Sequence, residues 1–168
     1  MKTIREGDLI FDVSSAVACE RFDDNKIHGS KSTMKRIDFI IEEEERFIFL
    51  EVKDPDKPGA SNPQKFHNDF RTGDFIPEVA RQCRDTLLFT KLRRDNDKPI
   101  SYVVLVCMQA LDEALLLAKT DELISALPVK NKSWANDSVG SCVILKLDAY
   151  KRMFGDGSVW RASDIERS

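Results

Sequence analysis

Residues 35–53, KRIDFIIEEEERFIFLEVK, decide the fold. The stretch predicts two strands folded back on each other, 36–41 and 46–52, with four glutamates at the bend between them. The second strand is nearly continuous in apolar residues, which is typical of a strand buried on both faces. Asp38 stands among isoleucine and phenylalanine in the first strand, and Glu51 and Lys53 close the second. Because ionisable groups are rarely buried without a partner or a task, these three are candidate site residues.

Side-chain parity brings the three candidates together. Residues two apart on a strand share a face, so Glu51 and Lys53 are neighbours. If the bend has two or four residues, Asp38 lies opposite Phe49, with Glu51 as its diagonal neighbour at roughly 7–8 Å. A bend of three or five residues would turn Asp38 to the other face. The pairing therefore predicts two carboxylates within reach of one cation.

Asp38, twelve intervening residues and then Glu51-Val52-Lys53 resemble the motif of the PD-(D/E)xK nuclease superfamily, with Ile37 in place of the proline. The resemblance covers about the first hundred residues in the order of elements. It implies an α/β restriction-endonuclease-like fold: a mixed β-sheet flanked by helices on both faces, with an α-β-β-β-α-β type core. It also implies that Asp38 and Glu51 hold Mg²⁺, which Mn²⁺ can replace. The carbonyl of Val52 would be a third ligand, and Lys53 would orient or activate the attacking water.

Phosphodiester hydrolysis explains why these residue types belong together. Carboxylates alone repel an anionic substrate, whereas a hard cation inverts that field and lowers the pKa of bound water. Mg²⁺ prefers oxygen ligands, and a lysine offsets charge that develops in the transition state. The alternative is an ion-pair cluster at the edge of a sheet. It explains Glu51 and Lys53, since strand ends are wet, and explains Asp38 in mid-strand poorly.

Two further residues are assigned through the resemblance. Ser14 or Ser15 caps a helix predicted to continue to Phe22, and many members of the superfamily use such a helix to supply a glutamate to the site. Glu20 matches that catalytic role, with a solvated helix glutamate as the alternative. A second helix is predicted over residues 78–94, where some subgroups carry a glutamine, and Gln82 is the match.

Candidate nucleic-acid contacts surround these positions. The polar segment 54–77 is predicted to be a long irregular loop, and it offers Lys57 and Lys65. The helix over 78–94 has a basic flank that includes Arg81, and Gln82 is the fourth candidate contact. The alternative is that the loop is a mobile surface segment and the basic flank a solvated helix face.

The remaining segments complete an alternation of strands and helices. Residues 9–11 form a short apolar piece of uncertain type. Strands are predicted over 100–108 and 139–147, and helices over 111–127 and 148–154, with a polar loop at 130–137. The length of 168 residues and this order of elements predict a single domain spanning 1–168.

Composition and short motifs limit the ligands and the cellular location that the sequence predicts. The net charge is −3, but residues 26–94 hold fourteen Lys/Arg against twelve Asp/Glu, which predicts at most a weak basic patch around the site. The four cysteines are far apart and form no CxxC pair, which favours reduced thiols over a cluster or zinc site. The sequence contains no GxxxxGK[ST], so no ATP site is expected. The charged first residues and the lack of a long apolar run favour a cytoplasmic protein without a membrane segment.

The sequence therefore predicts a Mg²⁺-dependent endonuclease that acts on DNA. Cleavage of both strands by one such site usually needs two copies, so a homodimer or a partner subunit is expected. One alternative is a catalytically inactive nuclease-like binding subunit of a larger nucleic-acid-processing or defence complex. Another is a nuclease of RNA or of branched or single-stranded DNA. A structural protein without metal is the last, and it predicts that Asp38 and Glu51 lie far apart or are separately salt-bridged.

Overall fold

The computed structural model describes residues 1–29, 31–93, 98–109, 111–129, 131–134 and 138–165. The strands are β1 Thr3–Glu6, β2 Leu9–Asp12, β3 Ala18–Arg21, β4 Phe39–Glu42, β5 Phe47–Lys53, β6 Ile100–Val106, β7 Ser141–Leu145 and β8 Val159–Arg161. The helices are α1 Asn25–His28, α2 Pro63–Thr72, α3 Phe75–Arg93, α4 Glu113–Ala126, α5 Leu147–Phe154 and α6 Ala162–Ile165, with a 3₁₀ turn, η1, at Asp156–Ser158.

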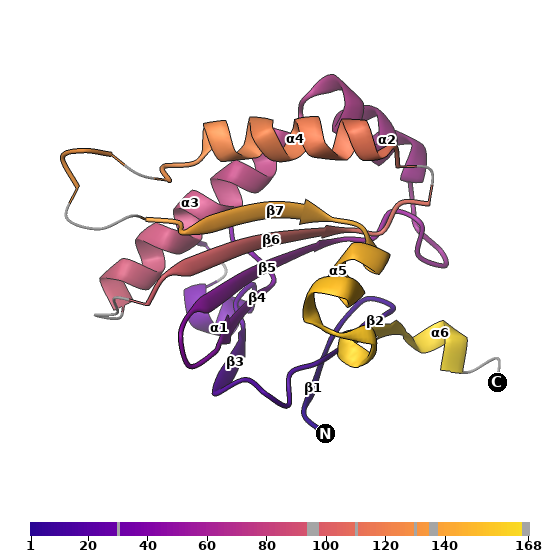
Figure 1. The fold of residues 1–168 in the computed structure, drawn as a ribbon, viewed down its shortest axis with the longest axis horizontal. Helices are drawn as coiled ribbons and strands as arrows, with labels where there is room; N and C mark the ends of the chain where they lie inside the picture. Colours follow the sequence, from indigo (N-terminus) through magenta and orange to yellow (C-terminus); the bar gives the residue numbers. More distant parts are fainter. Residues whose placement is uncertain (30, 94–97, 110, 130, 135–137, 166–168) are drawn as a thin grey trace.

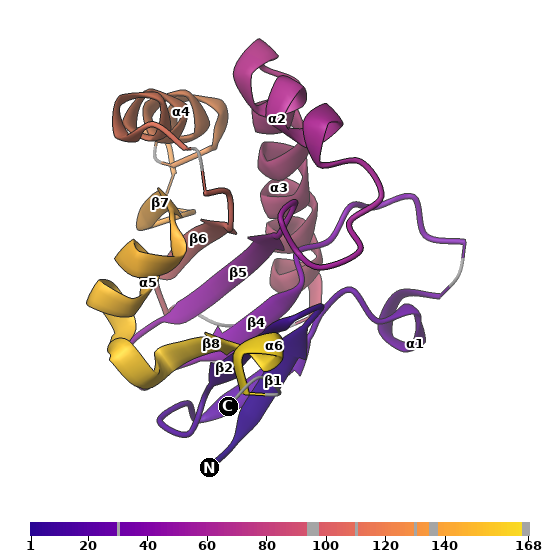
Figure 2. The same cartoon turned by 90° about the vertical axis from the view of Figure 1, so that its right-hand side faces the viewer.

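A mixed five-stranded sheet forms the centre of the protein, in the order β3-β4-β5-β6-β7 (Figure 1). Strands β3, β4 and β5 are antiparallel, whereas β5, β6 and β7 run parallel. Parallel neighbours need a crossover connection, which α2 and α3 provide between β5 and β6 and α4 provides between β6 and β7. Helices α3 and α4 cover one face and α5 lies on the other (Figures 1 and 2). The predicted α/β class, with helices on both faces of a mixed sheet, is confirmed.

Strand β5 is buried on both faces, as its apolar run predicts. Phe47 and Phe49 pack in the core beneath α3 and α4. Ile48 and Leu50 pack in a second core, against α5 and a small sheet of order β1-β2-β8. Because side chains alternate along a strand, Glu51 follows Phe49 to the face covered by α3.

The register of β4 against β5 corrects one prediction. Phe39 lies opposite Leu50 and Ile40 opposite Phe49, so Asp38 does not lie opposite Phe49 as expected. Continuing the observed register by one residue places Asp38 directly opposite Glu51. The bend has four residues, 43–46, and the shift is an even number, so Asp38 keeps the predicted face.

The prediction of a helix over residues 14–22 is wrong. Residues Ala18–Arg21 form β3, an edge strand in which Glu20 lies opposite Ile40 and Cys19 opposite Ile41. A free edge of β4 offers the backbone a full set of ladder hydrogen bonds, and Cys19 packs against the second core. Pairing with the sheet therefore outweighs the local helical pattern.

The segment predicted to be irregular, 54–77, contains α2. Asn62 caps this helix through its side chain, which accepts a hydrogen bond from the Lys65 N–H, and Pro63 opens the first turn. Helix α3 begins at Phe75, three residues before its predicted start. Arg94, Lys130 and residues 135–137 lie outside the described residues.

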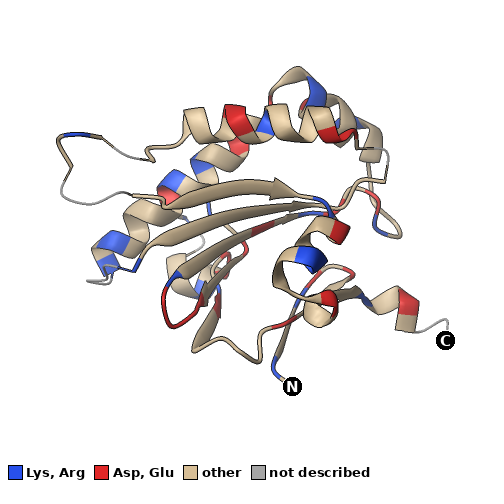
Figure 3. Cartoon of the chain, viewed as in Figure 1, with Lys and Arg blue, Asp and Glu red and all other residues tan. Residues whose placement is uncertain are grey.

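The charged side chains are distributed unevenly over this fold. Figure 3 shows acidic residues at the bend between β4 and β5 and basic residues along α3. Charged residues also follow one another where β5 ends, at Lys53, Asp54, Asp56 and Lys57. None of the helices in the described ranges is long and apolar enough to cross a membrane.

Candidate metal-binding site

Glu51 is a buried carboxylate with one unsatisfied oxygen. Its side chain is 2% exposed, on the face of β5 that α3 covers. Oε1 accepts hydrogen bonds from Lys53 Nζ at 2.9 Å and from Gln82 Nε2 at 2.8 Å. Oε2 is buried and has no hydrogen-bond partner among the residues that the structure describes. An unsatisfied buried carboxylate oxygen is costly, so its retention points to a ligand.

Helix α3 fixes this end of the sheet through three side chains. Glu78, Gln82 and Thr86 are four residues apart, so they share one face of the helix. Glu78 pairs with Lys53 Nζ at 3.0 Å, and Gln82 bonds Glu51 as described above. Thr86 Oγ1 accepts the Ile37 N–H at 3.2 Å, directly before Asp38. One face of α3 therefore contacts both parts of the motif, the segment before β4 that contains Asp38 and the end of β5 that contains Glu51 and Lys53.

Asp38 lies just before β4 and is bonded to the backbone of β5. Its Oδ2 accepts the N–H of Val52 at 2.7 Å. The C=O of a strand residue points to the same neighbour as its N–H, so the carbonyl of Val52 lies on the side of Asp38. The three residues predicted to supply metal ligands, Asp38, Glu51 and Val52, thus lie at neighbouring positions of the sheet, and their binding of metal stays a prediction.

Burial and repulsion both act on these carboxylates. Burial raises the pKa of Asp38 to about 8, and the nearby Glu51 carboxylate adds to the rise while the Val52 N–H opposes it. Burial also raises the pKa of Glu51, against the effect of Lys53. Burial alone would lower the pKa of Lys53, but Glu51 and Glu78 hold it above its ordinary value. The buried Glu51 and the half-buried Asp38 are therefore both influenced by one ammonium, that of Lys53, and a bound cation would offset the remaining negative charge.

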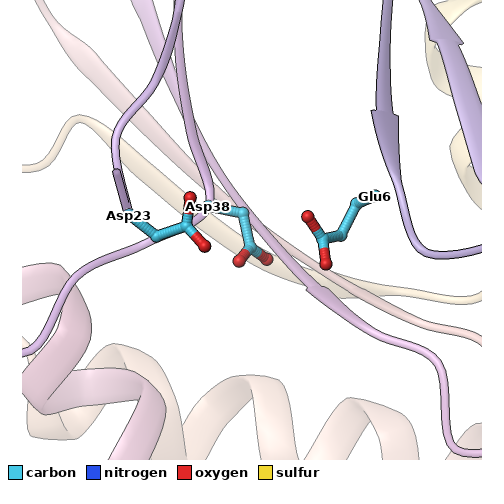
Figure 4. A group of neighbouring side chains, drawn as sticks. All are labelled: Glu6, Asp23 and Asp38. Atoms are coloured by element: carbon cyan, nitrogen blue, oxygen red, sulfur yellow. The ribbon is translucent and has the colours of Figure 1, made fainter. Parts of the chain in front are cut away.

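Two further acids lie beside Asp38. Carboxylate oxygens of Glu6, Asp23 and Asp38 lie within 4.8 Å of one another, and they come from the end of β1, from the residues after β3 and from the residue before β4 (Figure 4). Arg21 Nη1 bonds Glu6 at 2.7 Å and Asp23 at 3.4 Å. One guanidinium thus bonds two of the three carboxylates. Neither Glu6 nor Asp23 is among the site residues that the sequence predicts.

Glu20, predicted to supply a catalytic carboxylate, lies elsewhere. It points from β3 to Arg93 near the end of α3, with a distance of 2.8 Å between Oε1 and Nη1. The structure therefore does not bring Glu20 into the acidic group around Asp38. Glu6 and Asp23 take the positions beside Asp38 that a helical Glu20 was expected to fill.

The predicted nucleic-acid contacts have different surroundings, and their binding of nucleic acid stays a prediction. Gln82 is buried and bonds Glu51 and, at 3.2 Å, the carbonyl of Arg36. Lys65 pairs with Asp69, and Arg81 Nε lies 3.5 Å from Asp85 on the surface of α3. Lys57 lines a hollow beside the end of β5. The hollow has a volume of about 230 Å³, and its other lining residues include Val52, Lys53 and Phe66.

The donor set fits a hard divalent cation. Mg²⁺ and Mn²⁺ take oxygen ligands, and carboxylates on two adjacent segments with a backbone carbonyl between them are of that kind. Oε2 of Glu51 is a carboxylate oxygen that has no hydrogen-bond partner within the described ranges. Lys53 and Gln82 occupy the other oxygen and fix the orientation of the carboxylate.

Known proteins offer one distant structural similarity to this chain. No protein-family model matches the chain, and no curated protein does. Among solved structures, the chain is similar to the small subunit of the heterodimeric restriction endonuclease R.BspD6I, with 15% identity and a TM-score of 0.40. The match covers 92% of this chain and 69% of that chain. The site described above therefore stands on the geometry of this chain alone.

Proposed function

We propose that this chain is a metal-dependent nuclease that hydrolyses phosphodiester bonds in DNA. Asp38 and Glu51 would hold Mg²⁺, for which Mn²⁺ can substitute. Lys53 would orient or activate the attacking water and offset negative charge that develops on the phosphate. The observation that supports this most strongly is the buried, unpartnered Oε2 of Glu51, beside a second carboxylate, Asp38, that bonds the N–H of the next residue, Val52. The motif Asp38…Glu51-Val52-Lys53, by its resemblance to PD-(D/E)xK nucleases, supplies the reaction class.

A purely structural ion-pair cluster accounts less well for the same residues. It predicts that Asp38 and Glu51 lie far apart or are separately salt-bridged. Instead, Glu51 contributes to the raised pKa of Asp38, which places the two carboxylates near each other. A structural cluster would also satisfy both oxygens of Glu51, because a half-satisfied buried network is worse than an apolar one.

The side chains divide the work in the proposed reaction. A bound Mg²⁺ supplies Lewis acidity and a water of lowered pKa. The Lys53 ammonium, held between Glu51 and Glu78, is positioned to orient that water and to offset charge developing on the phosphate. Gln82 keeps the Glu51 carboxylate in a fixed orientation. The hollow that contains Lys53 and Lys57 provides space for the substrate backbone beside these groups.

DNA cleavage tests the proposal directly. Supercoiled plasmid and single-stranded DNA are incubated with Mg²⁺ or Mn²⁺ and the wild type, Lys53→Met or Glu51→Gln. We expect metal-dependent cleavage that falls by about 10²–10³-fold in both variants, because each loses a charge that acts on the transition state. Lys151→Met on α5 and the exposed Glu44→Gln at the β4–β5 bend are matched controls and should retain the wild-type rate.

Two results would contradict the proposal. Folded wild-type protein that binds Mn²⁺ in isothermal titration calorimetry but cuts neither substrate is a non-catalytic binding subunit. Folded protein that binds no Mn²⁺ at all carries a structural ion-pair cluster. We also propose that cleavage of both DNA strands requires a second copy or a partner subunit, so a single copy should nick plasmid faster than it linearises it.

A further inference from the structure

Arg161, the last residue of β8, joins acids from two distant parts of the chain. Its Nη1 and Nη2 bond the two carboxylate oxygens of Asp54, each at 2.9 Å. Nη1 also bonds Asp8 Oδ2 at 3.2 Å. The Asp54 side chain is 6% exposed and that of Arg161 is 20% exposed. A bidentate guanidinium–carboxylate pair fixes both distance and orientation, so Arg161 sets the position of Asp8 relative to Asp54.

The segment after Arg161 reinforces this connection at Asp8. Ser163 donates to the Asp8 carboxylate twice, from its hydroxyl at 2.8 Å and from its N–H at 3.0 Å. The N–H of Ala162 donates to the carbonyl of Asp8 at 2.8 Å. The turn between β1 and β2 is therefore bound to the C-terminal segment by backbone and side-chain contacts. We refer to Asp8, Asp54, Arg161 and Ser163 as the clamp.

Both ends of the clamp are next to the candidate site. Asp54 directly follows Lys53, and Asp8 lies two residues after Glu6. Strand β1 is at the edge of the small sheet and pairs with β2, not with the main sheet. Arg21 of β3 bonds the Glu6 carboxylate and the Arg5 carbonyl, which links β1 to the main sheet directly. The clamp is a second link, and it fixes the small sheet against the end of β5.

The charge around Glu6 favours a cation. Arg21 supplies one positive charge to a group of three carboxylates, Glu6, Asp23 and Asp38. Carboxylate oxygens of Glu6 and Asp38 lie within 4.8 Å of each other, so the two negative charges repel each other. A second sign of a ligand comes from outside this group, because Glu51 Oε2, on the strand opposite Asp38, is buried and unpartnered.

We infer that Glu6 is a further acid of the metal site and that Arg161 is the positioning residue which holds it there through Asp8 and Asp54. This inference rests on the proposed function, because it extends the same site. Glu6 would make the electrostatic potential at a bound cation more negative and would orient a water on that cation. Arg161 would contact neither the cation nor that water. The clamp thus fixes the spacing between the small sheet, which carries Glu6, and the main sheet, which carries Asp38 and Glu51.

A thermodynamic cycle on Mn²⁺ binding separates this role from a simple structural one. The affinity for Mn²⁺ is measured by isothermal titration calorimetry for the wild type, Glu6→Gln, Arg161→Met and the double variant, and Tm is measured for each without metal. We expect each single change to weaken binding by about tenfold, as loss of outer-sphere partners commonly does. The double variant should bind no more weakly than the weaker single variant, because Arg161 acts through Glu6.

Three further variants support the cycle. Arg152→Met removes an exposed arginine of α5 and should change neither quantity. Arg161→Lys keeps the charge but loses the bidentate pair, so its affinity should be intermediate. If Arg161→Met does not fold, Ser163→Ala loosens Asp8 more gently and should weaken Mn²⁺ binding by about two- to threefold.

Four results would overturn the inference. They are Mn²⁺ affinity unchanged in Glu6→Gln, a lower Tm with unchanged affinity in Arg161→Met, multiplicative losses in the double variant, and no Mn²⁺ binding by the wild type. The last result removes the proposed function as well, whereas the first three leave it intact. A wild type that binds Mn²⁺ and responds to the variants as expected but cuts no DNA supports the inference and contradicts the nuclease.

Discussion

Two groups of charged residues meet the end of β5, and the protein treats them in opposite ways. Against the small sheet, both oxygens of Asp54 are bonded to Arg161. Against α3, Glu51 has partners on Oε1, and Oε2 is left without one in the described part of the chain. Both carboxylates are buried, so the contrast lies in their partners.

The pKa values of two other carboxylates follow the same division. Burial would raise the pKa of Asp8, but Ser163 and Arg161 lower it below its ordinary value. The pKa of Asp38 is raised to about 8, by burial first and then by Glu51. A carboxylate whose charge is matched contributes to stability, and one whose charge is unmatched is kept at the expense of stability. The difference separates a structural network of ion pairs from the proposed metal site.

The largest effect on stability should come from breaking the matched group. Asp54→Asn removes one partner of a mostly buried ion pair and leaves the Arg161 charge undercompensated, so we expect the free energy of unfolding to fall by about 3 kcal/mol. Denaturation in urea measures this, with the exposed Asp121→Asn of α4 as the control. A loss no greater than that of the control would mean that the clamp does not stabilise the fold.

Metal binding at Asp38 and Glu51 should raise the free energy of unfolding. Mn²⁺ at about one hundred times its dissociation constant should add about 2.7 kcal/mol to the free energy of unfolding, which raises Tm by roughly 5–10 °C. Glu51→Gln should abolish this rise, whereas Glu44→Gln should keep it. An equal rise in Glu51→Gln would place the cation elsewhere. Differential scanning fluorimetry with and without Mn²⁺ is sufficient for the measurement.

The raised pKa of Asp38 predicts a pH-dependent cost in the absence of metal. Between its ordinary value of 3.8 and about 8, the folded protein holds a proton that the unfolded chain has lost, so stability falls as pH rises through this window. Asp38→Asn cannot titrate and still offers an oxygen to the Val52 N–H. At pH 8 without metal the variant should be more stable than wild type by about 2 kcal/mol, a figure reduced for the partial exposure of the side chain.

The measurement for Asp38→Asn is chemical denaturation at pH 4, 6 and 8 in the presence of a chelator. The advantage of the variant should shrink towards pH 4, where Asp38 is protonated in both states. An advantage of the same size at all three pH values would show that its cause is not the titration of Asp38.

The smallest effect is expected at Glu20. Its pair with Arg93 is partly exposed, with side-chain exposures of 23% and 40%, so Glu20→Gln should cost about 0.5 kcal/mol of stability. Cleavage of plasmid should stay within about a factor of two of the wild type, because Glu20 lies outside the acidic group. A loss of one hundredfold or more would return Glu20 to the catalytic role that the resemblance implied.

The central strands were predictable because their signal is local. The apolar run of β5 predicts burial on both faces, and alternation along the strand places Glu51 and Lys53 together. The predicted register was wrong by two residues, and an even error preserves the face of each side chain. For that reason Asp38 stays on the same face as Glu51 despite the error. The observed register, extended by one residue, puts Asp38 directly opposite Glu51, whereas a diagonal position was expected.

The missed features depend on contacts between distant segments. The four residues of β3 carry a pattern that also suits a helix, and only the free edge of β4 decides between the two. Glu6 lies in a small sheet whose third strand, β8, comes from the other end of the described chain. No local pattern predicts that Arg161 reaches Asp54.

The clamp has a consequence for the order of events during synthesis. Asp8 and Arg161 are 153 residues apart in the chain, so their contact forms only after almost all described residues have left the ribosome. Domains fold as units once their distant contacts become available, and such contacts slow folding. A nascent chain that already contains Asp38, Glu51 and Lys53 would still lack the docked small sheet. The proposed site would then be complete only after Arg161 has left the ribosome.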